Sequence, residues 1–145
     1  MVLRIVGRKR EKRGRAGMIL LIGLILFPSL ISCEEVVDEV YLLVRERELL
    51  AFSSMGNRWA ALHLRSGEKV LESKYAGRVA VVVTNLRALG FSALTNQWAE
   101  EKLMVGESMV ALEAEGNVGA VVTNLRAFGL SAATGRWIPR RFELK

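Results

Sequence analysis

The chain has 145 residues, of which 51% are hydrophobic, and its formal net charge is +6 at pH 7. This length allows one domain of ordinary size with a hydrophobic core. The excess charge lies entirely in residues 1–32, because residues 33–145 contain 14 basic and 14 acidic side chains. We therefore exclude nucleic acid as a partner, since binding to its phosphates requires a basic surface.

Residues 1–32 have the organisation of an export signal. Seven basic residues between Arg4 and Arg15 precede the apolar segment Ala16–Phe27. This order is typical of a secretory signal peptide. The alternative is an uncleaved signal anchor, because the 17 residues from Ala16 to Ser32 are at the lower limit of a membrane span.

The signal ends at Leu30-Ile31-Ser32-Cys33, which includes the only cysteine of the chain. Branched and small residues directly before a cysteine resemble the lipobox of bacterial lipoproteins. The resemblance implies that Cys33 carries lipid such as palmitate, that 1–32 is a lipoprotein signal peptide, and that 33–37 is a short tether. It also implies a membrane anchor. Glu34 after the cysteine favours the outer membrane of a Gram-negative source, facing the periplasm or the cell surface.

Residues 38–145 contain a repeat with a period of 39 residues. Gly77–Trp98 and Gly116–Trp137 are identical at 14 of 22 aligned positions. One period upstream, Leu49–Trp59 keeps the aromatic residue, the serine, the turn and the tryptophan. We therefore predict a β-repeat domain of three units. The units cover about 38–76, 77–115 and 116–145.

The residue pattern within one unit predicts four strands. Val79–Thr84 is rich in β-branched residues, and the turn that follows contains an asparagine, which tolerates left-handed backbone. Small and large residues then alternate in Arg87–Ala93, as expected for a second strand. The other two strands are predicted at Gln97–Leu103 and Met109–Ala114. The expected fold class is all-β.

Four-stranded units of about 40 residues occur as blades of β-propellers and as the units of a β-trefoil. The count of three favours a trefoil, whereas Val79–Val83, apolar on both faces, favours a blade that lies between two others. The segment Arg126–Trp137 resembles the blade motif of quinoprotein-like propellers, in which a small-residue-Thr-Gly turn is followed by a tryptophan that packs between blades. The resemblance implies propeller-blade-like geometry. It does not imply a quinone, and no cofactor is expected.

Three propeller-like units do not close a ring, so their apolar end faces must be covered. We expect a homodimer that forms a six-bladed ring. The last unit stops at Lys145 without its fourth strand, and the strand around Val36–Leu43 of the partner is expected to complete it. A trefoil that closes within one chain and a truncated product are the alternatives.

No residue pattern indicates catalysis or metal binding. His63, the only histidine, corresponds to Lys102 in the next unit and is therefore expected at the surface. Neighbouring carboxylates such as Glu100-Glu101 point to opposite faces of a strand, so they do not form a pair of catalytic acids. No glycine-rich phosphate loop leads from a strand into a helix. We therefore expect no enzyme activity and no metal site.

Two sets of residues recur with the repeat. Asn85, Arg87, Asn124 and Arg126 belong to equivalent hairpins, where they either stabilise turns and pair with acids of a neighbouring unit, or form an array that faces a ligand. Trp59, Trp98 and Trp137 are expected to pack between units.

These observations predict a lipid-anchored envelope protein whose non-catalytic β-repeat domain is a binding or scaffold module. Its partner would be another envelope protein. The alternative is a carbohydrate-binding, lectin-like module, in which exposed tryptophans stack on a glycan. Burial of the tryptophans favours the first function, and their exposure in shallow pockets favours the second.

Overall fold

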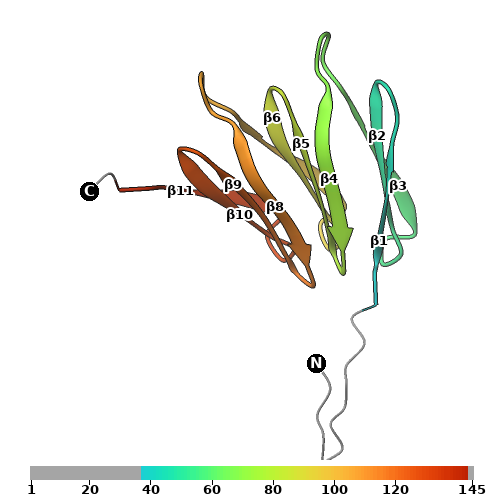
Figure 1. The fold of residues 1–145 in the computed structure, drawn as a ribbon. Coiled ribbons are helices and arrows are strands. Elements are labelled where there is room, and N and C mark those ends of the chain that lie inside the picture. The colour runs from blue at the N-terminus through green and yellow to red at the C-terminus, as the bar shows by residue number, and fades with distance from the viewer. Residues whose placement is uncertain (1–36, 144–145) are drawn as a thin grey trace, which may run out of the picture. The chain divides into compact units, whose positions relative to one another are not determined.

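The computed structural model describes residues 37–143, and these residues form a domain built from strands alone (Figure 1). The expected all-β class is therefore confirmed. The predicted export signal and Cys33 lie outside the described residues. The strands are β1 (Val40–Val44), β2 (Glu48–Ser53), β3 (Arg58–His63), β4 (Val70–Ala76), β5 (Val79–Thr84), β6 (Arg87–Ser92), β7 (Gln97–Lys102), β8 (Met109–Glu115), β9 (Val118–Thr123), β10 (Arg126–Ser131) and β11 (Arg136–Arg141).

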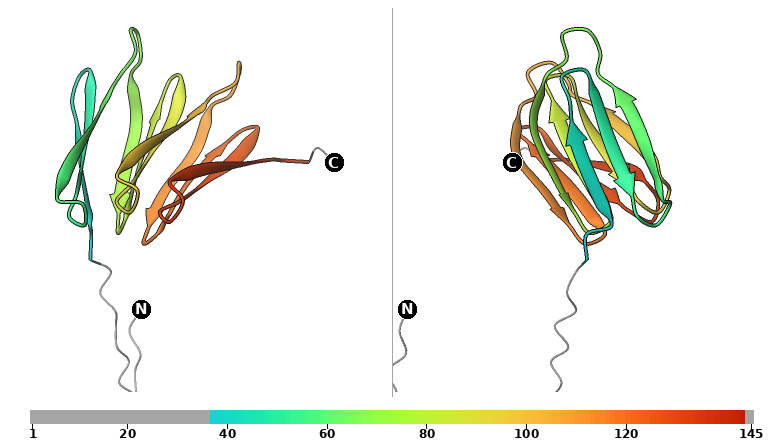
Figure 2. Two further views of the ribbon diagram at one scale, coloured as in Figure 1. Left: turned by 180° about the vertical axis from the view of Figure 1, so that it is seen from behind. Right: turned by 90° about the vertical axis from the view of Figure 1, so that its right-hand side faces the viewer.

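The strands form three antiparallel sheets in which consecutive strands are neighbours. The first sheet contains β1, β2 and β3, the middle sheet β4 to β7, and the last sheet β8 to β11. The middle sheet lies between the other two, and successive sheets fan out (Figure 2). Within this stack β4 and β8 lie side by side.

The four strands predicted for one unit agree with the structure to within one residue at each end. Val79–Thr84 coincides with β5, while β6 and β7 end one residue earlier than predicted and β8 ends one residue later. The predicted boundaries after 76 and after 115 fall in the hairpins β4–β5 and β8–β9. Each of these sheets therefore takes its first strand from the preceding sequence unit.

This grouping corrects the expectation that the last unit lacks its fourth strand. The last sheet has four strands, because β8 precedes residue 116 and pairs with β9. Among the described residues, the first sheet has three strands. The segment predicted to complete a partner's last sheet instead contributes β1, which pairs with β2 of its own chain from Val40↔Ser53 to Val44↔Leu49.

The two inner strands of the middle sheet, β5 and β6, are buried on both faces because this sheet is the central layer. All six residues of β5 and all six of β6 are buried, whereas buried and more exposed residues alternate in β2 and β9. This confirms that the apolar run Val79–Val83 lies between two layers. Transfer of each buried Val or Leu side chain from water contributes roughly 1.5 to 3 kcal/mol.

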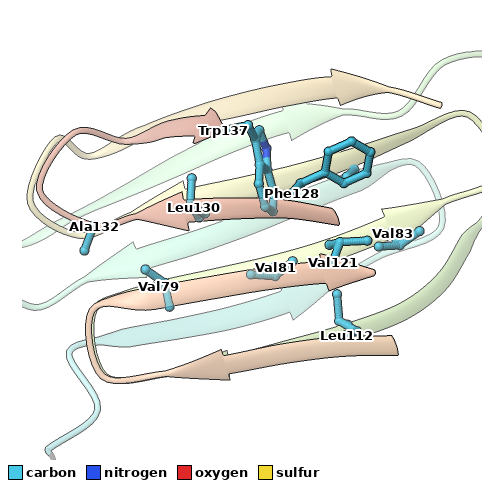
Figure 3. Close-up of a cluster of buried hydrophobic side chains, with 10 residues drawn as sticks. Val79, Val81, Val83, Leu112, Val121, Phe128, Leu130, Ala132 and Trp137 are labelled. Atoms are coloured by element: carbon cyan, nitrogen blue, oxygen red, sulfur yellow. The ribbon is translucent and has the colours of Figure 1, made fainter. Parts of the chain in front are cut away.

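Two hydrophobic clusters separate the three layers. Val82 and Phe91 of the middle sheet pack with Val40 and Leu49 of the first sheet. The opposite face packs against the last sheet, as Figure 3 shows. This second cluster includes Val79, Val81, Val83, Leu112, Val121, Phe128, Leu130, Ala132 and Trp137.

Glycines allow the middle and last sheets to approach closely. A Cβ atom added at Gly90 would lie 2.6 Å from Leu130 Cδ2 and 2.9 Å from the Trp137 ring. One added at Gly119 would overlap Val81 Cγ2. Small residues at these strand positions thus determine the spacing between the two layers.

Candidate functional site

The hairpin between β5 and β6 binds the loop that leads into β4. Asn85 Oδ1 accepts a hydrogen bond from the backbone N–H of Lys69 at 2.8 Å, and its Nδ2 donates to the carbonyl oxygen of Gly67 at 3.1 Å. Thr84 Oγ1 accepts from the backbone N–H groups of Leu86 and Arg87, both at 3.1 Å. Side chains of the Thr-Asn turn therefore satisfy backbone groups that the strand ladder leaves unpaired.

A buried ion pair joins the same hairpin to the same loop. The Arg87 guanidinium donates to Glu68 from Nε at 2.8 Å and from Nη2 at 3.0 Å. The carboxylate also accepts from Thr84 Oγ1 at 2.8 Å and from the backbone N–H of Arg65 at 2.7 Å. The Glu68 side chain is 0% exposed and that of Arg87 is 6% exposed. Arg87 thus binds Glu68 in a bidentate manner, and both carboxylate oxygens accept hydrogen bonds.

The last sheet contains the same arrangement one period later. Arg126 donates to Glu107 from Nε at 2.9 Å and from Nη2 at 3.0 Å. Thr123 Oγ1 donates to the same carboxylate at 2.8 Å. Asn124 accepts from the backbone N–H of Ser108 at 2.9 Å and donates to the carbonyl oxygen of Gly106 at 3.0 Å.

Both buried carboxylates remain charged because of their partners. Burial alone would raise the pKa of Glu68, but hydrogen bonds from Arg87, the backbone of Arg65 and Thr84, together with the positive charge, bring this pKa below its ordinary value of 4.5. The pKa of Glu107 is lowered against the effect of burial in the same way, chiefly by Arg126. The ion pairs therefore persist at neutral pH.

The two arginines also bind the preceding sheet. Arg126 Nη1 donates to Glu101 Oε1 at 2.9 Å, and its Nη2 donates to the carbonyl oxygen of Lys102 at 2.7 Å. Arg87 Nη2 donates to the carbonyl oxygen of His63 in the first sheet at 3.3 Å, whereas its Nη1 donates to Glu100 in β7 of its own sheet. The structure thus places all four recurring polar residues in contacts within the chain.

The tryptophans occupy equivalent positions in the final strand of each sheet. Trp98 Nε1 donates to the carbonyl oxygen of Ala60 at 3.1 Å, and Trp137 Nε1 donates to that of Ala99 at 3.3 Å. Each of these two rings therefore contacts the preceding sheet. Trp137 is 8% exposed, Trp98 is half-buried and Trp59 is 52% exposed.

An aromatic surface surrounds Trp59 on the outer face of the first sheet. The ring centroid of Trp59 is 6.4 Å from that of Tyr41, and Tyr41 is 5.9 Å from Tyr75. All three rings are exposed. Phe52, which is half-buried, packs on Trp59 at 5.2 Å. We call Tyr41, Phe52 and Trp59, which all belong to the first sheet, the aromatic face; Tyr75 belongs to β4 of the middle sheet.

Sequence reasoning missed a cavity of about 430 Å³ at the loops of the first and middle sheets. It is partly open, and its lining includes the cations Arg47, Arg65 and Lys69 as well as the buried Glu68. The corresponding loop before β8 has Met104 and Ser108 in place of Arg65 and Lys69. The basic lining is therefore particular to the first of these two loops.

The remaining predicted residues are placed as follows. His63 is exposed, and its Nδ1 lies 3.9 Å from Glu48 Oε1. Glu100 pairs with Arg65 and Glu101 with Arg126, so the two carboxylates serve different neighbours. Residues 37–143 contain no group of side chains that could coordinate a metal ion.

The sequence matches no protein-family model, and no curated protein is significantly similar to it. In the part of the chain that the structure describes, no helix has the length and hydrophobicity needed to cross a membrane.

Proposed function

We propose that this protein is a lipid-anchored component of the bacterial envelope whose β-repeat domain is a non-catalytic binding or scaffold module. The observation that carries the proposal is the aromatic face, where the large rings of Trp59 and Tyr41 are exposed on the outer face of the first sheet. Large exposed apolar patches mark interaction sites on soluble domains. The buried side chains of Arg87 and Arg126, by contrast, are engaged in structural contacts.

Propeller-blade-like geometry is the arrangement we favour for the three sheets. It is supported by the four-stranded meanders of the middle and last sheets, by the central layer with two apolar faces and by the fanned stacking. The tryptophans that bond to the preceding sheet add to this support. A β-trefoil remains the alternative.

The anchor is tested by replacing Cys33 with alanine. The proposal predicts loss of labelling by a palmitate analogue and loss of membrane retention in a bacterial host that processes lipoproteins, because the thiol is the acylated group. Ser66→Ala, at an exposed loop residue, is the control and should leave labelling unchanged. In a Gram-negative host the wild-type label should fractionate with the outer membrane. Labelling that persists in Cys33→Ala would exclude the anchor.

A lectin-like function is the second candidate, because the aromatic face offers an exposed Trp59 flanked by Tyr41. Stacking on a sugar ring would quench tryptophan fluorescence. Titration with chitotetraose and with cellotetraose should then show saturable quenching that Trp59→Ala abolishes. Phe142→Ala, at another exposed aromatic residue, should bind as the wild type does. No quenching by either sugar would count against the lectin and leave the scaffold function.

A further inference from the structure

The two internal interfaces between sheets follow one pattern. Where the middle sheet meets the first, Trp98 donates to the carbonyl of Ala60 and the backbone N–H of Glu39 donates to Gly77 at 2.6 Å. Where the last sheet meets the middle one, Trp137 donates to the carbonyl of Ala99 and the N–H of Arg78 donates to Gly116 at 2.7 Å. The second set of contacts repeats the first set at positions 39 residues later in the sequence.

The outer face of the first sheet is built like a face that docks on a preceding sheet. Trp59 is equivalent to Trp98 and Trp137, and Phe52 is equivalent to Phe91. Phe91 is fully buried against the first sheet, whereas Trp59 is more than half exposed. Phe52 and Trp59 therefore are the residues of a docked face without a sheet packed on them, while Tyr41 stands where the middle sheet has Ala80.

The outer face of the last sheet is built like a face that receives a following sheet. Val118 and Ile138 are equivalent to Val79 and Ala99 of the middle sheet, which pack against the last sheet. Val79 is fully buried, but Val118 is 57% exposed and Ile138 is 68% exposed. The two ends of the stack thus present the two halves of one interface.

The charges at these ends are complementary. At the interface between the middle and last sheets, Arg126 pairs with Glu101. Two periods before Arg126 the equivalent residue is Glu48 on the first sheet, and one period after Glu101 the equivalent residue is Arg140 on the last sheet. The registers are equivalent too, since Ala88 pairs with Glu101 and Ala127 pairs with Arg140. The arginine position thus carries an acid on the first sheet, and the glutamate position carries a base on the last sheet. The two end faces can therefore form the same ion pair with the charges exchanged.

We propose that the aromatic face of one copy of this chain docks on the outer face of the last sheet of a second copy. Trp59 Nε1 then donates to the carbonyl of Ile138 in the second copy, and Glu48 pairs with Arg140 there. The contact joins two different surfaces, and each copy carries both of them. Two copies can therefore make the contact twice, once in each direction, and form a closed dimer. The inference rests on the proposed binding function of the aromatic face and names its partner as a second copy of this chain. It does not depend on the lipid anchor, because it concerns residues 37–143 alone.

Charge reversal in the full chain tests this contact. The wild-type chain in detergent is expected to self-associate with rising concentration in analytical ultracentrifugation. Glu48→Arg and Arg140→Glu should each weaken association at least about tenfold, because each brings like charges together. Lys69→Glu, outside both faces, is the control. Equal melting temperatures would show that the variants fold.

Mixing the two single variants gives the decisive readout. In a pair with one copy of each, both contacts again join opposite charges, so the mixture should associate about as strongly as the wild type. The double variant Glu48→Arg/Arg140→Glu should recover in the same way. A wild-type chain that stays monomeric, association that neither reversal weakens, or a mixture that fails to recover would each overturn the proposal.

Discussion

Replacing Arg87 by methionine is expected to lower the free energy of unfolding by about 3 to 5 kcal/mol. Methionine preserves much of the aliphatic volume, but it leaves the Glu68 carboxylate buried without its cation. Breaking a buried pair by removing one partner costs more than the pair itself contributes, because the remaining charge stays desolvated. Urea unfolding at pH 7 measures the loss. Arg78→Met is the matched control, because Arg78 pairs with Glu39 at the surface and its replacement should cost much less than that of Arg87.

The pH dependence of the same variant separates a charge effect from a packing effect. In the wild type the lowered pKa of Glu68 means that the pair stabilises the fold fully above about pH 4.5, and this contribution is lost as the pH falls through the lowered pKa. In Arg87→Met the largest effect that offsets burial is lost, so the pKa of Glu68 rises and protonation of its carboxylate relieves the penalty. The stability difference should therefore shrink on acidification. A constant difference, or a loss no larger than that of Arg78→Met, would contradict the assignment.

Trp137→Ala is expected to cost about 3 to 5 kcal/mol, because it removes a buried ring from the cluster between the middle and last sheets. Trp59→Ala makes the same change at an equivalent position, but in dilute solution it should cost about 1 kcal/mol or less, since half of this ring already faces water. Thermal unfolding of both variants at low protein concentration gives the comparison. Similar losses would mean that the repeat position, and not the neighbouring sheet, determines the role of these tryptophans.

The strands could be predicted from the sequence because each carries a local signal. β5 is a run of β-branched residues, and its predicted and observed limits are the same. The grouping of strands into sheets was harder, because a period of 39 residues does not say where one sheet ends. β4 and β8 therefore appeared to belong to the preceding units, although they pair with β5 and β9.

The partners of the recurring arginines could be found only in three dimensions. Glu68 lies 19 residues before Arg87, and Glu107 lies 19 residues before Arg126. This equal spacing was the signal that the sequence offered. The exposure of Trp59 was missed for a related reason: a repeat reproduces a residue without reproducing the neighbour on which it packs.

The hydrogen bond from a tryptophan to the preceding sheet has a consequence for how such a chain can grow. Each sheet carries the donor ring on one face and the acceptor carbonyl on the other, as Trp98 and Ala99 do in β7. A duplicated segment of 39 residues would therefore bring both halves of the interface with it, and only the outermost sheets would need new contacts. Lengthening by tandem gene duplication thus requires no new recognition surface, which is how two segments identical at 14 of 22 positions can be accommodated in one fold.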